Sequence, residues 1–192
     1  KTLSTPTNTD KWTYNTWLKR SETGDASAIF NMLSDASNDN SIFFQDNDTI
    51  RMYNHTSGSV NAELITNRVF RDISAWYMFT IIFDSGNSTA GNRWRLFVNG
   101  VEETSFSSDV QPSQNTDSHN LNGNTLNIGV INDSYDFFNG YYAQSCFIDG
   151  QALTPDSFSE FDEDSGILKP IDVSGLTFGT NGFLLDYEDS AN

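Results

Sequence analysis

Residues 76–83 form a mostly apolar run without glycine or proline, which fits a strand that is covered on both faces. After a polar loop, residues 93–98 alternate. They place three apolar side chains on one face, namely Trp94, Leu96 and Val98. Asn99-Gly100 then supplies the two positive-φ positions of a type I′ turn. The pattern therefore predicts an antiparallel centre, in which residues 76–83 lead to a tight hairpin of residues 93–98 and 101–106.

Shorter strand patterns fill most of the remaining chain. Residues 12–18 alternate, with Trp12, Tyr14, Thr16 and Leu18 on one face. Further strands are expected at residues 28–33, 42–45, 49–54, 59–66, 125–131, 140–148 and 183–187. Many short strands separated by closely spaced turns predict an all-β fold, a sandwich of two antiparallel sheets.

Polar segments separate these strands. Residues 34–41, rich in Asp and Asn, are typical of a turn, because such side chains cap their own backbone. Residues 107–124 form a long polar loop, and residues 132–139 form a loop rich in Asp and aromatic residues. Thr154 and Pro155 have the order of an N-cap and a first helical residue, so at most one or two short helices are expected. Nothing marks an internal boundary, and residues 1–192 are expected to form a single domain.

The composition narrows the function classes. Among 192 residues, Lys and Arg number 10 and Asp and Glu number 26, which gives a formal net charge of −16. This charge disfavours nucleic acid and an anionic membrane surface, because phosphate binding needs a positive surface. No apolar run approaches the length of a membrane span, so no membrane insertion is expected. The single cysteine, Cys146, lies in a strand-like run and is expected to be a small core residue.

Several short motifs follow one another in a recognisable order. They are Val98-Asn99-Gly100, then Leu126 to Gly129, then Gly140 to Ile148, then Ala152-Leu153-Thr154. In order and spacing the chain resembles the concanavalin A-like lectin/glucanase superfamily, and most closely its laminin-G-like and pentraxin-like domains. The resemblance covers roughly residues 10–188 and implies a jelly-roll sandwich of two curved antiparallel sheets. Residues 147–155 and 160–166 resemble a laminin-G-like variety found in marine bacteriophage structural proteins.

The resemblance also implies a calcium site. Pentraxin-like domains carry a D-N pair in the turn after an early strand and a second acidic loop after the I/L-G strand. The matching positions are Asp39, Asn40, Asn132 and Asp133. Loops from two strands can supply the six to eight oxygen ligands that Ca²⁺ takes. The alternative is that these residues only form turns, and Ile131 replaces an acid of the family pattern.

A second candidate site is a glycan-binding rim. Asp133, Tyr135, Asp136 and Phe137 lie in the loop of residues 132–139. Exposed aromatic faces stack on sugar C–H surfaces, and neighbouring carboxylates accept hydrogen bonds from hydroxyl groups. The alternative, favoured for Phe138 and Tyr142, is that the aromatic residues cap the end of the core.

Catalysis is the third candidate. Glu160, Asp162 and Asp164 stand at alternate positions, as the acids of glucanases in this superfamily do, but acidic runs are usually solvated. A lyase would need Tyr, His and Arg together on the concave sheet, and His55 and His119 both lie in expected turns. We therefore expect no catalytic residues.

Together with these observations, the resemblance implies a non-enzymatic domain on a virion surface or otherwise outside the cell, which recognises glycan or another cell-surface ligand. The alternatives are a purely structural virion component and a glycan-cleaving enzyme. Neighbouring virion proteins and a second copy of the chain are further expected partners. Because the chain begins at Lys1 without a methionine, we also expect it to be a piece of a longer protein.

Overall fold

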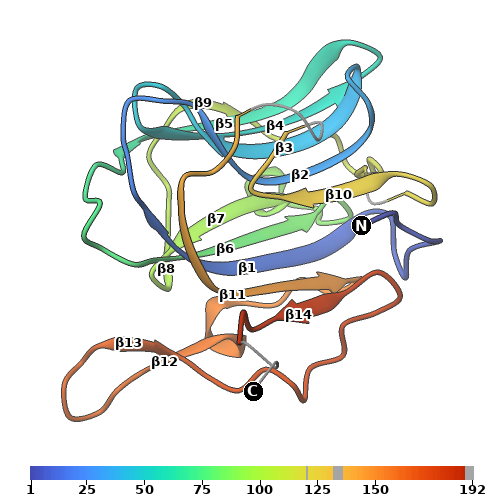
Figure 1. The fold of residues 1–192 in the computed structure, drawn as a ribbon. Coiled ribbons are helices and arrows are strands. Elements are labelled where there is room, and N and C mark those ends of the chain that lie inside the picture. Colours follow the sequence, from blue (N-terminus) through green and yellow to red (C-terminus); the bar gives the residue numbers. More distant parts are fainter. Residues whose placement is uncertain (120, 132–135, 189–192) are drawn as a thin grey trace.

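The computed structural model describes residues 1–119, 121–131 and 136–188, and it is an all-β sandwich of two six-stranded antiparallel sheets, as the sequence predicts (Figure 1). Two single turns of 3-10 helix, η1 (Ala90–Asn92) and η2 (Pro155–Ser157), are the helical elements of these residues. Thr154 and Pro155 take the N-cap and first positions of η2, as expected. Neither turn, nor any other helix within the described ranges, is long and apolar enough to cross a membrane.

Two sheets, called sheet A and sheet B, form the sandwich. Sheet A consists, in spatial order, of β10 (Thr125–Ile128), β2 (Ser27–Asp35), β3 (Asn38–Phe44), β4 (Thr49–Thr56), β5 (Ser59–Val69) and β9 (Phe106–Val110). Sheet B consists of β14 (Phe183–Leu185), β11 (Gly140–Asp149), β1 (Lys11–Arg20), β6 (Tyr77–Asp84), β7 (Trp94–Val98) and β8 (Val101–Glu102). A separate hairpin pairs β12 (Ser159–Phe161) with β13 (Leu168–Pro170).

The core between the two sheets is aromatic. Alternation along β1 turns Trp12 and Tyr14 toward sheet A, where both are fully buried. Trp12 stacks on Phe83 of β6 with ring centroids 5.6 Å apart, and it lies 5.7 Å from Phe30 of β2 across the sandwich. Such aromatic pairs stabilise the fold beyond the area that they bury.

The central hairpin forms as predicted up to its turn. The φ angles of Asn99 and Gly100 are 51° and 82°, and Val98 pairs with Val101. The strand expected over residues 101–106 is wrong beyond Glu102, because the chain then crosses to sheet A. There Phe106–Val110 forms the edge strand β9, where a loop was expected. The sequence of β9 is largely polar, and backbone pairing at a sheet edge needs no apolar alternation.

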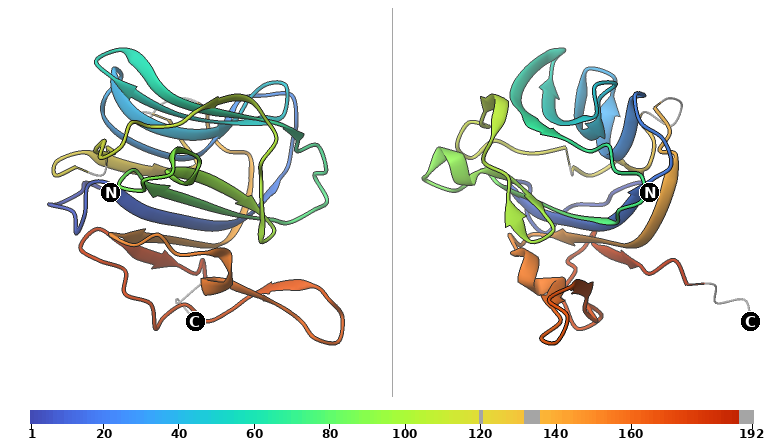
Figure 2. Two further views of the ribbon diagram at one scale, coloured as in Figure 1. Left: turned by 180° about the vertical axis from the view of Figure 1, so that it is seen from behind. Right: turned by 90° about the vertical axis from the view of Figure 1, so that its left-hand side faces the viewer.

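The C-terminal segment adds a third layer over the outer face of sheet B (Figure 2). Cys146 and Ile148 of β11 lie on that face and pack with Phe158 and Val173, and all four are buried. Cys146 is thus the small core residue that the sequence indicates, and burial raises the pKa of its thiol to about 12. The second core explains why the outer face of β11 carries the apolar residues Cys146 and Ile148.

A buried ion pair lies at the end of β1. Arg20 is 1% exposed, and its Nη1 lies 3.0 Å from Asp48 Oδ1 and 2.7 Å from the carbonyl oxygen of Phe70. Asp48 also accepts hydrogen bonds from Arg71 Nε and from the backbone N–H of Gly24. Burial alone would raise the pKa of Asp48, but these donors outweigh it and hold that pKa below its usual value.

The first residues of the chain connect sheet A with the segment before β14. The amino group of Lys1 donates to the carbonyl oxygen of Leu126 at 2.8 Å, and Thr2 forms an antiparallel bridge with Thr125. Ser4 and Asn181 then exchange three hydrogen bonds. The N-terminal segment is thereby fixed to two distant parts of the sequence.

Candidate functional site

The outer face of sheet A carries a row of polar and aromatic side chains across five neighbouring strands. The strand register aligns Asn127, Asn31, Ser41, Tyr53 and Glu63 on β10, β2, β3, β4 and β5. Because their neighbours in the sequence face the inter-sheet core, alternation turns these side chains outward. We call this row, together with Asp39, Arg51 and His55 beside it, the polar face.

One half of the polar face is a chain of hydrogen bonds. Asn31 Nδ2 donates to Ser41 Oγ at 2.7 Å, and Ser41 Oγ donates to Asp39 Oδ2 at 2.6 Å. The other carboxylate oxygen of Asp39 lies 3.2 Å from His55 Nδ1. Asn31, Ser41 and Asp39 are all buried, so the network holds these groups in fixed positions.

The other half of the polar face is aromatic and charged. The rings of Tyr53 and His55 meet edge to face with centroids 5.1 Å apart, and the guanidinium carbon of Arg51 lies 4.7 Å from the Tyr53 centroid. Glu63 Oε1 forms an ion pair with Arg51 Nη2 at 2.7 Å, and Glu63 Oε2 accepts a hydrogen bond from Ser108 Oγ. Tyr53, His55, Arg51 and Glu63 are all partly exposed, so this half is accessible to a ligand.

Two buried polar atoms of this face have no hydrogen-bond partner. They are Asn31 Oδ1, an acceptor, and Asn127 Nδ2, a donor, on residues that pair directly across β2 and β10. Buried polar atoms are paired in most structures, and exceptions are often satisfied by water or a ligand. A hydroxyl group can satisfy both atoms, because it donates and accepts. This part of the polar face therefore suits a polyhydroxylated ligand.

Asp39 and Asn40, predicted as calcium ligands in a turn, lie instead within β3, so that placement is wrong. The turn itself occupies only residues 36–37, because the Asx-rich residues after it pair with β2 and β4. Consecutive strand residues face opposite sides. Asp39 therefore lies on the polar face, whereas Asn40 faces the inter-sheet core, with its Nδ2 3.4 Å from Asn54 Oδ1.

The remaining predicted site residues lie in or beside the loop after β10. Asn132, Asp133 and Tyr135 lie outside the described residues, so their roles stay predictions. The carbonyl oxygen of Asp136 accepts a hydrogen bond from the backbone N–H of Ala28, and Phe137 is exposed. Phe138 and Tyr142 pack against the core, as expected.

The structure does not bring Asp39, a predicted calcium ligand, close to Asp136, a predicted glycan-binding residue of the loop after β10. Asp136 bonds to Ala28, whereas Asp39 pairs with Leu33, five residues farther along β2. At ~3.3 Å per residue this difference corresponds to roughly 17 Å. Within residues 1–119, 121–131 and 136–188, no three His, Cys, Asp or Glu side chains are grouped to hold a metal ion. The calcium hypothesis therefore stays a prediction that depends on Asn132 and Asp133.

Sequence reasoning missed the polar face because it placed His55 in a turn. His55 lies in β4, with Arg51 and Tyr53 at alternate positions of the same strand. The signal was present, since the alternation of residues 49–54 continues for one more polar residue. His119 does lie in a loop, but it is buried, and its Nε2 lies 2.6 Å from the carbonyl oxygen of His55. Burial lowers the pKa of His119.

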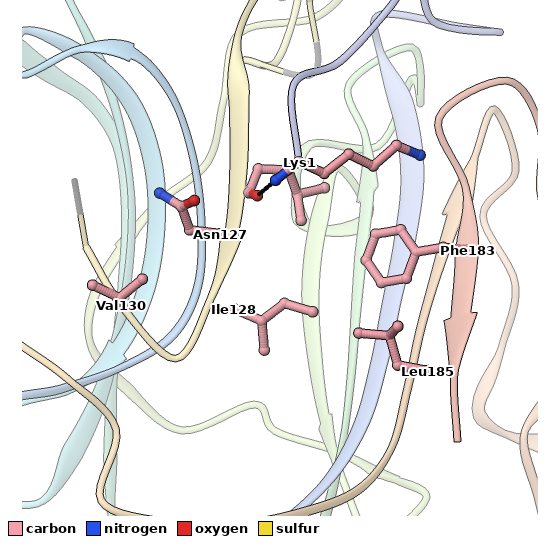
Figure 3. A pocket seen from close by; sticks show the side chains of 7 residues that line it. Lys1, Asn127, Ile128, Val130, Phe183 and Leu185 are labelled. Atoms are coloured by element: carbon pink, nitrogen blue, oxygen red, sulfur yellow. Dashed lines mark hydrogen bonds between the residues drawn. The ribbon is translucent and has the colours of Figure 1, made fainter. Parts of the chain in front are cut away.

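A hollow of about 340 Å³ lies between the open edges of the two sheets at β10 and β14 (Figure 3). Ile128, Phe183 and Leu185 face one another across it. Lys1 Nζ lies beside it, 5.6 Å from the Phe183 ring and 2.8 Å from the carbonyl oxygen of Asn181. Asn127 points to the other side of β10, toward the polar face. The lining of this hollow is mainly apolar and suits a polar ligand less well than the polar face does.

Solved structures show the fold of this chain in other proteins, and 54 chains match it. A SAP-like pentraxin from Limulus polyphemus has a TM-score of 0.55 and 16% identity, over 80% of this chain and 69% of that one. A putative carbohydrate binding protein from Bacteroides ovatus has a TM-score of 0.56 and 12% identity, over 100% and 50%. The sialidase CBM40 of Ruminococcus gnavus, bound to α2,3-sialyllactose, has a TM-score of 0.55 and 11% identity, over 81% and 80%. At these identities the likeness concerns the fold alone.

Comparison of the sequence with known families is more direct. No curated protein matches the chain. A family model described as "Concanavalin A-like lectin/glucanases superfamily" matches residues 1–157, which include every strand of the two sheets except β14. The two antiparallel sheets and this match agree, and the chain therefore belongs to the concanavalin A-like lectin/glucanases superfamily as a laminin G-like domain.

Proposed function

We propose that this domain is a non-enzymatic binding module that recognises glycan through the polar face. The observation that carries the proposal is the pair of buried, unpartnered atoms Asn31 Oδ1 and Asn127 Nδ2. Tyr53 lies in the same row, two strands from Asn31 and three from Asn127, which is roughly 10 Å and 14 Å in a sheet. A glycan lying across the strands can place a C–H face against the partly exposed Tyr53 ring and bring hydroxyl groups to the Asn31–Asn127 end of the row, where both residues are at most 8% exposed.

Two further observations support a glycan as the ligand. Some similar structures are described as carbohydrate-binding, which makes the fold compatible with this role. The net charge of −16 disfavours polyanionic ligands, so a glycan of low charge is the better candidate.

Replacing Tyr53 or Asn127 with alanine is expected to weaken glycan binding about tenfold, because each change removes one contact worth about 1–1.5 kcal/mol. Binding is measured first on a glycan array and then by calorimetric titration of the strongest glycan. Asn127 Nδ2 has no partner to lose, and the melting temperature of both variants is measured beside binding to confirm that each is folded. Tyr141→Ala removes an exposed aromatic residue of sheet B and serves as the control. Wild-type affinity in both polar-face variants would refute the proposal.

The place of the domain is also proposed, on the resemblance stated for the sequence. We propose display on a virion or cell surface, where neighbouring virion proteins and further copies of the chain are the expected contacts. Antibody labelling of intact particles tests this location. Absence of label, together with binding to no glycan, would favour a different role altogether. Labelled particles without any glycan binding would instead favour the purely structural role.

The calcium prediction is tested separately. If Asn132 and Asp133 hold Ca²⁺, millimolar CaCl₂ raises the melting temperature and EDTA reverses the rise, because a ligand that binds only the folded state stabilises it. The same measurement on Asp133→Asn is the control, since this change removes a charged ligand from the same loop. An identical melting temperature in CaCl₂ and EDTA would remove calcium from the proposal.

A second candidate function, polysaccharide β-elimination, is favoured by one observation. Arg51, Tyr53 and His55 share the outer face of β4, and these residue types can neutralise a uronate carboxylate and transfer a proton. Against it, Arg51 is already paired with Glu63. Incubation with alginate or pectate, followed by ultraviolet absorbance, detects unsaturated products. Product that disappears in His55→Ala would replace the binding module with a lyase.

A further inference from the structure

A cleft of about 590 Å³ lies on the side of the molecule opposite to the polar face, between sheet B and the β12–β13 hairpin. Figure 1 shows this hairpin beyond sheet B, on the side away from sheet A. Its residues lie past residue 157, where the family match ends. The cleft is thus formed with a part of the chain that the family match does not cover.

Two side chains in this cleft present buried polar atoms without a partner. Trp17 of β1 and Gln144 of β11 pair across their strands, which places their side chains next to each other on the outer face. Trp17 is 8% exposed, and its Nε1 donor has no partner; Gln144 Oε1, a buried acceptor, has none either. Leaving such atoms buried without a partner destabilises the unliganded protein. The cleft therefore offers one donor and one acceptor that a ligand can satisfy together.

The remaining lining of the cleft is aromatic, aliphatic and acidic. Trp76, just before β6, is 42% exposed and presents an indole surface, and Ile167 adds an aliphatic one. Asp186 and Glu188 add carboxylates that follow β14. A volume of about 590 Å³ falls within the range of roughly 300–1,000 Å³ that is usual for ligand sites.

The wall made by the hairpin is held in a defined shape. The N–H of Asp162 donates to the carbonyl oxygen of Ile167 at 2.9 Å, and the N–H of Gly166 donates back to the carbonyl oxygen of Asp162 at 2.8 Å. Gly166 has a φ of 68°, which suits glycine at this turn. Lys169 Nζ lies 3.3 Å from carboxylate oxygens of both Glu160 and Asp162. The wall is therefore preformed, and a ligand need not order it.

The chemistry of the cleft selects among ligand classes. Carboxylates and a net charge of −16 disfavour an anion. A quaternary cation would suit the indole of Trp76, but it cannot accept a hydrogen bond from Trp17 Nε1. A neutral pyranose satisfies every group: its hydroxyls accept from Trp17 and donate to Gln144 and the carboxylates, and its C–H face packs on Trp76.

We infer that this cleft is a second saccharide site, specific for neutral pyranose rings. It shares no residue with the polar face and stands on its own observations, so it does not depend on the function proposed for that face. If both sites are occupied, the domain can join two glycan chains from opposite sides, which increases the avidity for a surface that displays many chains.

Tryptophan fluorescence of the whole chain tests the site, because Trp17 and Trp76 both line it. The probes are methyl pyranosides of glucose, galactose and mannose, with cellobiose and lactose as longer forms. A saturable change with at least one of them is expected. Trp17→Phe keeps an aromatic ring but removes the donor, and it should raise the dissociation constant about tenfold. Trp76→Ala should abolish the response.

Matched controls separate the two sites. Tyr53→Ala, on the polar face, should keep the full fluorescence response even if it loses binding on the glycan array. Trp76 is partly exposed, so its alanine variant keeps the proposal falsifiable if Trp17→Phe fails to fold. No saturable response to any probe, or a response that both tryptophan variants retain, overturns the inference. A response to tetramethylammonium chloride alone would likewise overturn it, since that cation offers no acceptor to Trp17.

Discussion

Replacing Arg20 with methionine is expected to lower the free energy of unfolding by about 3–5 kcal/mol, because it leaves a buried carboxylate without its main buried partner. Methionine fills a similar volume over the Phe44 ring, where the guanidinium carbon now lies 4.3 Å from the centroid. It cannot donate to Asp48 or to the carbonyl oxygen of Phe70. Urea denaturation measures the loss as a lower midpoint with an unchanged slope.

Arg71→Met is the matched control, since Arg71 binds the other oxygen of Asp48 but its side chain is 63% exposed. Its loss is expected to cost no more than about 1 kcal/mol. Equal effects of the two substitutions would show that the Arg20–Asp48 pair is not desolvated.

The difference in the free energy of unfolding between the wild type and Arg20→Met should also depend on pH. The folded-state pKa of Asp48 is lowered, so the unfolded chain binds the proton more tightly. The stability that this carboxylate contributes is therefore complete above its ordinary pKa of about 4 and is lost as the pH falls through the lower folded-state value. The difference in the free energy of unfolding between the two proteins should therefore become smaller as the pH falls below about 4.

Replacing Phe158 with alanine is expected to cost about 3–5 kcal/mol, the range for removing a fully buried aromatic ring. Phe158 is completely buried in the second core, against Cys146 and Ile148 of β11. Phe158 lies just past residue 157, where the family match ends, but its ring covers the outer face of β11 in sheet B. Thermal unfolding should show a single transition at a lower temperature.

Phe161→Ala is the control for this change. Phe161 lies three residues farther along the same segment, but it is 60% exposed, so its loss should change the stability by no more than about 0.5 kcal/mol. Two separate transitions in the Phe158→Ala protein, with the main one unshifted, would show instead that the C-terminal layer folds independently of the sandwich.

The sequence predicts well those elements whose pattern is local. The β6–β7–β8 segment combines an apolar strand, an alternating strand and the Asn99-Gly100 turn, and each signal is contained in a few residues. The pairing of β9 with β5 has no such signal, because it depends on where the chain crosses between sheets.

The candidate site was harder to predict because its residues are typical of turns but lie here in strands. Asp39 and Asn40 are typical turn formers, but here ladder pairing with β2 and β4 overrides that preference. The polar face becomes visible only when the register aligns Asn127, Asn31 and Tyr53 on three strands. Register across a sheet is set by tertiary packing, which no single segment reveals.

The sandwich alone did not predict the third layer, although one signal was present. Trp17 lies on the face of β1 opposite to Trp12 and Tyr14, where a two-layer sandwich would place a polar residue. A buried tryptophan there indicates that something covers the outer side of sheet B. Alternation therefore predicts a covered face, but not that residues 158–173 cover it.

The hydrogen bonds between Ser4 and Asn181 join residues separated by 177 positions, and β1 lies between β6 and β11. During synthesis β1 therefore cannot complete its pairing until β6 and then β11 have left the ribosome. Closing such long loops costs entropy before any contact repays it, so we expect folding on the slow timescale of milliseconds to seconds typical of nonlocal β proteins. Until then the early strands expose unpaired edges, and this interval is when the domain is most prone to aggregate.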